Sequence, residues 1–170
     1  MITDEPPVVT RVATVCTGNI CRSPMAEVVF RDLVERDERL RATVIVSSAG
    51  TARWHEGAPM DPRARRALDR AGLRGAGSPA AYADAAYLDA HDVVVVMTRE
   101  HRDDVLARRR RGVGQVILLR DLIDETDLDL ADPYYGTDED FDECLAVIRR
   151  AGQRWTSEFL RRRDAGSSAV

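Results

Sequence analysis

The chain has 170 residues, a formal net charge of −4 at pH 7 and a hydrophobic share of 44%. This length suits one domain with a sizeable core, and the charge argues against nucleic acid or an anionic membrane as the main partner. No apolar run approaches the roughly 18 residues that a membrane span needs. Residues 1–7 are acidic without an apolar signal region, and three cysteines form no disulfide framework. We therefore expect a cytoplasmic protein without membrane insertion, although export without a signal peptide stays open.

The first predicted element is a valine-rich strand over 8–15, followed by a loop that begins at Cys16 and reaches Arg22. The five residues between them can curl into a cup of inward-pointing N–H groups, which binds an oxyanion such as phosphate. Arg22 adds a rigid two-pronged donor that matches phosphate oxygens. Cys16 would lie at the base of the cup, where a thiolate can attack phosphorus. The other residues of this predicted phosphate-binding loop are Thr17, Gly18, Asn19, Ile20, Cys21 and Ser23.

A helix over 24–37 is predicted directly after the loop, with Ser23 as its N-cap and Pro24 at its first position. The loop would then join a strand to a helix N-terminus, where backbone N–H groups and the dipole favour anions. The same field favours a thiolate over a thiol at Cys16.

Strands and helices alternate along the rest of the chain, which predicts an α/β fold with a four-stranded parallel sheet and helices on both faces. Ligands of such sheets bind at the carboxyl ends of the strands, where the Cys16 loop would lie. We expect a single domain over 1–170, with an ordered core of about 8–162 and a frayed, flexible tail over 164–170. The remaining predicted elements are strands over 42–47, 93–97 and 116–119, and helices over 61–72, 99–110 and 141–159, the last capped by Thr137.

A long irregular stretch over 121–137 contains Asp132, followed by Pro133. An Asp-Pro step by itself most often marks a turn, but long loops in compact domains are often functional. If the bound phosphate is an ester of a phenol, whose pKa is about 10, the attack also needs a general acid, because the phenolate leaves poorly without a proton. A carboxylic acid on this loop can supply that proton.

At three places in order along the chain, the sequence resembles the low-molecular-weight protein tyrosine phosphatases. These are VCTGNICRSPMAE at 15–27, SAGT at 48–51 and DPYYG at 132–136. WHEG at 54–57 resembles the bacterial branch of the family. The resemblance spans about 8–160 and is highly specific, because the loop is accompanied by a distant Asp-Pro.

The resemblance implies hydrolysis of phosphotyrosine through a phosphorylated Cys16, with Asp132 as general acid and then base. It implies that Asn19 holds the shape of the loop and that Ser23 steadies the thiolate. Phosphotyrosine-containing proteins would be the substrates, phosphate or vanadate the inhibitors, and no metal or organic cofactor is expected. The cleft walls would be Trp54, Tyr134 and Tyr135, which could otherwise be ordinary surface residues.

Three other functions stay open at this point. An arsenate reductase would need further well-placed cysteines, and only Cys144, expected to be buried and inert, is left. A phosphoarginine phosphatase resembles this loop but carries Thr where this chain has Ile20. A non-catalytic phosphate-binding module would need neither a nucleophile nor an acid. Cys21 is interpreted as a redox partner that could trap oxidised Cys16 as a disulfide, or alternatively as a filler of the loop interior.

We expect the other histidines and an arginine run to lie outside the chemistry. His91 and His101 are interpreted as structural or exposed, and His55 as either a helper or a surface residue. The arginines at 108–111 are expected to form a solvated helix end.

Overall fold

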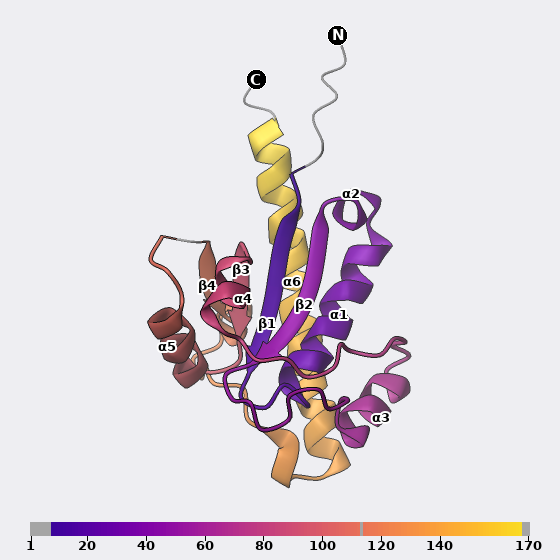
Figure 1. Cartoon of the computed structure of the whole chain (residues 1–170). Helices are drawn as coiled ribbons and strands as arrows, with labels where there is room; N and C mark the ends of the chain where they lie inside the picture. Colours follow the sequence, from indigo (N-terminus) through magenta and orange to yellow (C-terminus); the bar gives the residue numbers. More distant parts are fainter. Residues whose placement is uncertain (1–7, 113, 168–170) are drawn as a thin grey trace.

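A four-stranded parallel sheet forms the centre of the protein, as seen in a computed structural model that describes residues 8–112 and 114–167 (Figure 1). The strand order is β2-β1-β3-β4, and every neighbouring pair is parallel. This confirms the predicted sheet. The strands are β1 (Thr10–Cys16), β2 (Val44–Gly50), β3 (Val93–Val96) and β4 (Gln115–Leu118).

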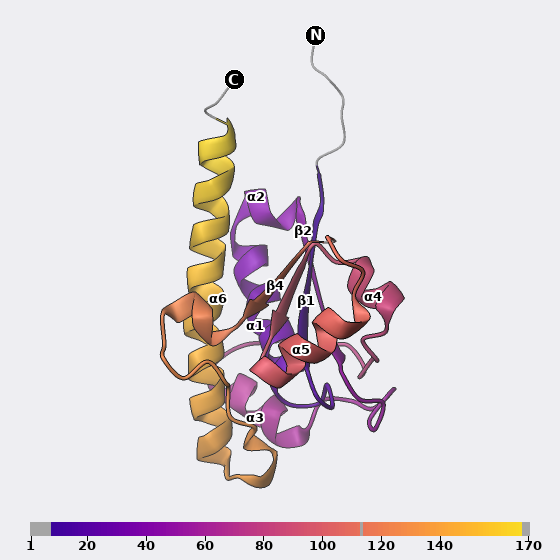
Figure 2. The ribbon, with the colours of Figure 1, turned by 90° about the vertical axis from the view of Figure 1, so that its left-hand side faces the viewer.

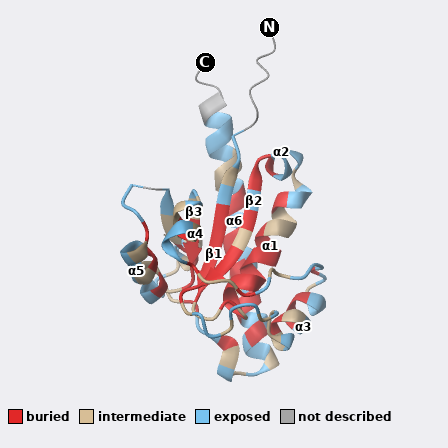
Figure 3. Cartoon of the chain, viewed as in Figure 1, coloured by how far each residue is buried: buried red, intermediate tan, exposed pale blue. Residues whose placement is uncertain are grey.

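Helices cover both faces of the sheet, also as predicted (Figure 2). On one face α1, α3 and α6 pack around Val12 of the central strand, and on the other α4 and α5 pack around Val15. Successive side chains of β1 therefore enter two separate cores, which is why the buried part of this strand, from Val12 to Cys16, is apolar except for Thr14. Figure 3 shows the strands and the inner helix faces as mostly buried. The helices are α1 (Arg22–Arg36), α2 (Glu38–Arg41), α3 (Pro62–Arg70), α4 (Ala85–Asp89), α5 (Arg99–Arg108) and α6 (Asp138–Ser167), with 3-10 turns η1 (Arg120–Ile123) and η2 (Pro133–Tyr135).

Short polar side chains fix the helix starts. The Asp61 carboxylate accepts from Arg63 N before α3, which has Pro62 at its first position, and Gly72 adopts a left-handed φ of 72° just after this helix. Asp37 follows α1 and caps α2 through two backbone N–H groups. The sequence analysis missed α2 and α4, because helices of four or five residues carry too little periodicity to detect.

Several predicted boundaries differ from the structure by a few residues, and two of the differences change an assigned role. Helix α1 begins at Arg22, so Ser23 is not its N-cap, and its hydroxyl turns into the phosphate-binding loop instead. Helix α6 continues to Ser167, so 164–167 are helical rather than part of a tail, and 168–170 lie outside the described residues. An ion pair between Asp164 and Arg39 ties this part of α6 to α2 at 3.4 Å.

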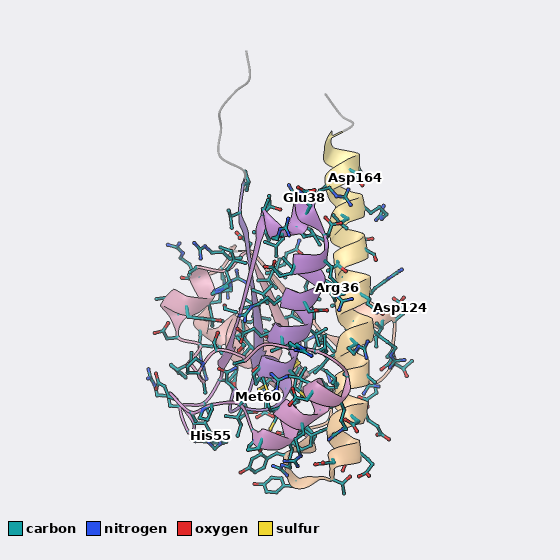
Figure 4. The ribbon with its side chains drawn as sticks, turned by 90° about the vertical axis from the view of Figure 1, so that its right-hand side faces the viewer. Arg36, Glu38, His55, Met60, Asp124 and Asp164 are labelled. Carbon is teal, nitrogen blue, oxygen red and sulfur yellow. The ribbon has the colours of Figure 1, made fainter. Side chains whose placement is uncertain are left out.

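Within the described residues, none of the helices has the length and apolar character that crossing a membrane requires. The carboxyl ends of the parallel strands gather the segments that carry the predicted site. Figure 4 shows His55 and Met60 near this end of the molecule, and Asp164 and Glu38 at the opposite end.

Candidate active site

The loop between β1 and α1 borders a cavity of about 210 Å³. Cys16 at the end of β1 is almost fully buried, and its Sγ lies 3.0 Å from Ser23 Oγ. Asn19 adopts a left-handed φ of 56°, which turns the chain back toward α1. The cavity is lined by Cys16, Thr17, Gly18, Ile20, Cys21, Arg22, Trp54, His55, Asp132, Tyr134 and Tyr135.

The buried side-chain amide of Asn19 links the loop to its surroundings. Its Nδ2 donates to Ser23 Oγ at 2.7 Å and to Ser48 Oγ at 2.9 Å, and its Oδ1 accepts from Ala81 N at 2.9 Å. Gly50 lets the chain approach closely, because a Cβ there would lie 2.5 Å from Thr17 O. The loop shape is therefore held by contacts with residues 29 to 62 positions away.

A fully buried carboxylate, Glu27, continues this network, and the sequence analysis missed it. Ser48 Oγ donates to Glu27 Oε2 at 2.6 Å, Ser78 Oγ donates to Oε1 at 2.7 Å, and Arg31 forms an ion pair with the same carboxylate. A continuous path of polar contacts therefore runs from Cys16 through Ser23, Asn19 and Ser48 to Glu27. The available signal was an acidic residue among the apolar positions of α1, with an arginine four residues later.

Arg22 and Asp132, which are 110 residues apart in sequence, meet in the structure. The Arg22 guanidinium is buried, and its Nη2 donates to Asp132 Oδ2 at 2.9 Å while Nη1 donates to Leu130 O at 3.0 Å. Its Nε has no hydrogen-bond partner among the described residues. Asp132 is about half exposed, and its Oδ1 accepts from Tyr134 N at 3.2 Å. A cation, a carboxyl group and a thiol thus share one cavity.

Large aromatic side chains surround the mouth of the cavity. Trp54 is 78% exposed and Tyr135 is 96% exposed, although both are apolar enough to favour burial. The rings of Tyr134 and Tyr135 meet edge to face, with centroids 4.9 Å apart. The structure thus brings the three predicted wall residues to the cavity, together with His55.

His101 is a second residue whose place at the site the sequence analysis missed. It is buried, and its Nε2 lies 2.7 Å from Thr17 Oγ1 in the phosphate-binding loop. Burial, followed by the nearby positive charge of Arg22, lowers the pKa of His101 to about 4. The imidazole is therefore neutral near pH 7. No pattern in the sequence pairs Thr17 with a residue 84 positions later.

Other predicted residues lie outside the chemistry. His91 contacts Ser47 Oγ at 2.9 Å through Nε2, and burial lowers its pKa. Cys144 is buried, and burial raises the pKa of its thiol to about 12, as expected for an inert cysteine. The expectation that the arginines at 108–111 are all solvated is wrong for Arg109. This residue is buried and donates to the carbonyl oxygens of Gln115, at 3.1 Å, and of His91.

Comparison with known proteins gives a consistent result. The family profile described as low molecular weight phosphotyrosine protein phosphatase matches residues 11–165. A low molecular weight protein-tyrosine-phosphatase of Streptomyces coelicolor is 42% identical over 146 residues, covering 83% of this chain and 88% of that protein. The low molecular weight protein-tyrosine phosphatase A of Mycobacterium tuberculosis is 40% identical over 150 residues, covering 82% and 85%. The structure of Vibrio vulnificus Wzb in complex with benzylphosphonate superposes with a TM-score of 0.76 at 25% identity, covering 88% and 99%.

The fold and the loop together define a small α/β protein in which a loop after the first strand brings a buried cysteine and a buried arginine to one cavity. The profile and the relatives make the assignment specific: the chain belongs to the low-molecular-weight phosphotyrosine protein phosphatase family.

His101 should make the stability of the protein depend on pH below neutrality. The folded protein keeps this imidazole neutral down to about pH 4, whereas the unfolded chain protonates it near pH 6.5. Protonation of His101 therefore does not reduce the free energy of unfolding above about pH 6.5. As the pH drops toward 4, it lowers this free energy by an amount on the order of 3 kcal/mol.

His101→Gln, whose amide nitrogen can replace Nε2, should reduce this acid sensitivity. The measurement is the free energy of unfolding from urea titrations at pH 7 and at about pH 4.5, with His55→Gln at the cavity rim as the matched control. Equal pH dependence in wild type and His101→Gln would contradict a buried neutral imidazole.

Proposed function

We propose that this protein hydrolyses phosphotyrosine in proteins, with Cys16 as nucleophile, Arg22 as phosphate-binding cation and Asp132 as general acid and base. The observation that carries this proposal is the convergence of the three groups on one cavity, although Asp132 comes from a distant loop. Membership of the phosphatase family supports it. A phosphate-binding module would need neither the thiol nor the carboxyl group at this position.

The surroundings of Cys16 favour its action as a thiolate. Asn19 donates into Ser23 Oγ, so the Ser23 hydroxyl hydrogen is left to point at Cys16 Sγ, at 3.0 Å, or at Ala49 O, at 3.3 Å. A hydroxyl donor at the sulfur stabilises its negative charge. The N-terminus of α1 lies directly after the loop and adds a favourable field.

In the first step the Cys16 sulfur attacks phosphorus, the bond from phosphorus to the phenolic oxygen breaks, and Asp132 gives its proton to that oxygen. Loop N–H groups and Arg22 hold the three equatorial oxygens as charge spreads over them. The phosphoryl group takes the place of Asp132 as the partner of Arg22, which frees the carboxyl group to reach the leaving oxygen.

In the second step water attacks the phosphorus of the cysteinyl-phosphate, and Asp132 takes up a proton from that water. The sulfur–phosphorus bond breaks, which releases inorganic phosphate and restores the Cys16 thiolate. Arg22 and the loop N–H groups stabilise the negative charge on the phosphoryl oxygens in both steps. We therefore propose that no metal or organic cofactor takes part.

The aromatic rim suits an aryl phosphate. Trp54 and Tyr135 can pack against the two faces of a phenol ring as it enters the cavity, and Ile20 adds an apolar contact at its border. The benzylphosphonate bound to the Vibrio vulnificus relative is also an aryl-bearing phosphate analogue. We propose phosphotyrosine-containing proteins as substrates, phosphate and vanadate as inhibitors, and a cytoplasmic location, where a reactive thiol stays reduced.

The direct test is turnover of matched phosphotyrosine, phosphoserine and phosphoarginine peptides. We expect phosphotyrosine to be the preferred substrate. Cys16→Ser should abolish turnover yet still bind vanadate, because the cup and Arg22 survive. Preference for phosphoarginine, or turnover by Cys16→Ser within about tenfold of wild type, would contradict the proposal.

Asp132→Ala should harm substrates with poor leaving groups most, because only these need a proton during bond cleavage. Phenyl phosphate should lose about 10²- to 10⁴-fold in kcat/KM, the usual scale of general acid catalysis, and an activated nitrophenyl ester less. Steady-state kinetics on both esters measures the difference. Equal losses on the two esters would remove Asp132 as the acid.

We also propose that Cys21 is a redox partner of Cys16. Peroxide would oxidise Cys16 to a sulfenic acid, which the Cys21 thiol attacks to form a disulfide and water. Burial, followed by the negative charges of Asp61 and Asp132, raises the pKa of Cys21, so this thiol stays protonated during catalysis and trapping should be faster at higher pH.

Cys21→Ser should therefore keep most activity but lose its recovery by a dithiol after mild peroxide treatment. Mass spectrometry should find the Cys16–Cys21 disulfide in wild type, and Cys144→Ser, which changes the buried thiol in α6, is the matched control. Sulfinic acid on Cys16 without any disulfide in wild type would show that Cys21 does not protect it.

A further inference from the structure

We propose that Arg63 is a positioning residue that holds the loop carrying Asp132 at its working distance from the phosphate-binding loop. Arg63 lies in the first turn of α3 and does not line the cavity. The inference rests on the proposed function, because it assigns Arg63 a part in proton transfer by Asp132. It acts through three sets of contacts.

The first set joins Arg63 to the loop of Asp132. Arg63 Nη1 donates to Tyr134 O at 2.8 Å, and the Tyr134 N–H donates to Asp132 Oδ1 at 3.2 Å. The two sides of the Tyr134 backbone are thus bonded to Arg63 and to the catalytic carboxyl group. Any shift of Tyr134 therefore moves Asp132.

The second set places the guanidinium of Arg63 against two aromatic rings. Its central carbon lies 5.3 Å from the centre of the Tyr134 ring and 4.9 Å from that of Phe141. Phe141 is fully buried near the start of α6, so it provides a rigid surface. A planar cation beside aromatic faces keeps one orientation, which a flexible ammonium would not.

The third set joins Arg63 to the phosphate-binding loop through Asp61. Arg63 Nε and Nη2 donate to the two oxygens of Asp61 at 3.1 and 2.9 Å, a forked ion pair with the Asp61 side chain 10% exposed. The Asp61 N–H in turn donates to Ile20 O at 2.8 Å. Asp61 and Arg63 therefore link the two loops: Asp61 bonds to the carbonyl of Ile20 in the phosphate-binding loop, and Arg63 bonds to the carbonyl of Tyr134 in the loop that carries Asp132.

The link through Arg63 matters because Arg22, which joins the phosphate-binding loop directly to Asp132, is itself used in the reaction. Arg22 holds Asp132 at 2.9 Å, yet Arg22 must turn to the phosphoryl oxygens during catalysis. Arg63 itself does not line the cavity, and its contacts with Asp61, Tyr134 and Phe141 do not depend on Arg22, so they persist through that change. A misplacement of a catalytic group by about 1 Å can cost about 10²-fold in rate, so the loss of this support should show in the step that uses Asp132.

The test compares variants of Arg63 on two esters. Arg63→Met keeps the apolar stem but loses the donors, and kcat on phenyl phosphate should fall by roughly 10- to 100-fold. The activated nitrophenyl ester should lose less than about threefold, because it needs little proton transfer. Arg66→Ala is the matched control: it removes an ion pair from α3 to Asp138, at 2.9 Å, without touching η2, and should leave both rates near wild type.

A double variant separates positioning from a general structural role. If Arg63 acts through Asp132, adding Arg63→Met to Asp132→Ala should cost little further on phenyl phosphate. An equal loss on both esters, or the full loss repeated in the Asp132→Ala background, would overturn the inference. Vanadate binding and Tm of each variant show whether the cup is intact. Should Arg63→Met not fold, Arg63→Lys, which keeps the charge but not the fork, must still show the ester difference, and its absence there would equally overturn the inference.

Failure of the proposed function would look different. It would appear in wild type, as a lack of phosphotyrosine turnover, or in Asp132→Ala alone, as equal losses on both esters. If those two controls behave as proposed and only the Arg63 variants lack an ester difference, the positioning role alone is wrong.

Discussion

The hydrogen bonds of one buried amide, Asn19, set the shape on which the rest of the site depends. The loop needs its N–H groups to point inward, and this requires a left-handed residue at its tip. Asn tolerates that conformation better than most residues, and its side chain can bond on both sides. Its donors go to Ser23 and Ser48 and its acceptor takes Ala81 N, so α1, β2 and the segment before α4 all hold the same turn.

The buried charged groups differ between the loop and the residues behind it. The loop contains the positive Arg22, whereas His101 and Glu27 behind the loop are neutral and negative. Arg22 is buried, and among the described residues its ion-pair partner is the carboxylate of Asp132. His101 beside Thr17 is kept neutral by its burial and by the same arginine. Glu27 is buried as well, but two serines and Arg31 satisfy it, and it touches the loop only through Ser48 and Asn19. The carboxyl group of Asp132 lines the cavity together with Arg22, whereas the Glu27 carboxylate does not line it.

The parallel sheet explains why residues so far apart in sequence converge. All four strands end at the same edge, so the segments after β1, β2, β3 and β4 meet there. The loop after β1 supplies the thiol and Arg22, the segment after β2 supplies Trp54, and the stretch after β4 supplies Asp132. At the start of α3, Asp61 bonds to the loop after β1 and Arg63 bonds to the stretch after β4.

The sequence by itself determined the features that depend on near neighbours. Cys16 and Arg22 lie at the two ends of one short loop, so their shared site follows from their spacing, and the valines of β1 and β3 and the Asp61-Pro62 start of α3 are equally local. Tertiary structure decided the direction of the Ser23 hydroxyl, which lies against Cys16 Sγ, Asn19 Nδ2 and, from β2, Ala49 O instead of capping the helix. It also decided the burial of Glu27, the contact of His101 with Thr17, and the burial of Arg109. For Glu27 and His101 the hydrogen-bond partners Ser48, Ser78 and Thr17 lie 21 to 84 positions away, and only packing brings them within hydrogen-bonding distance.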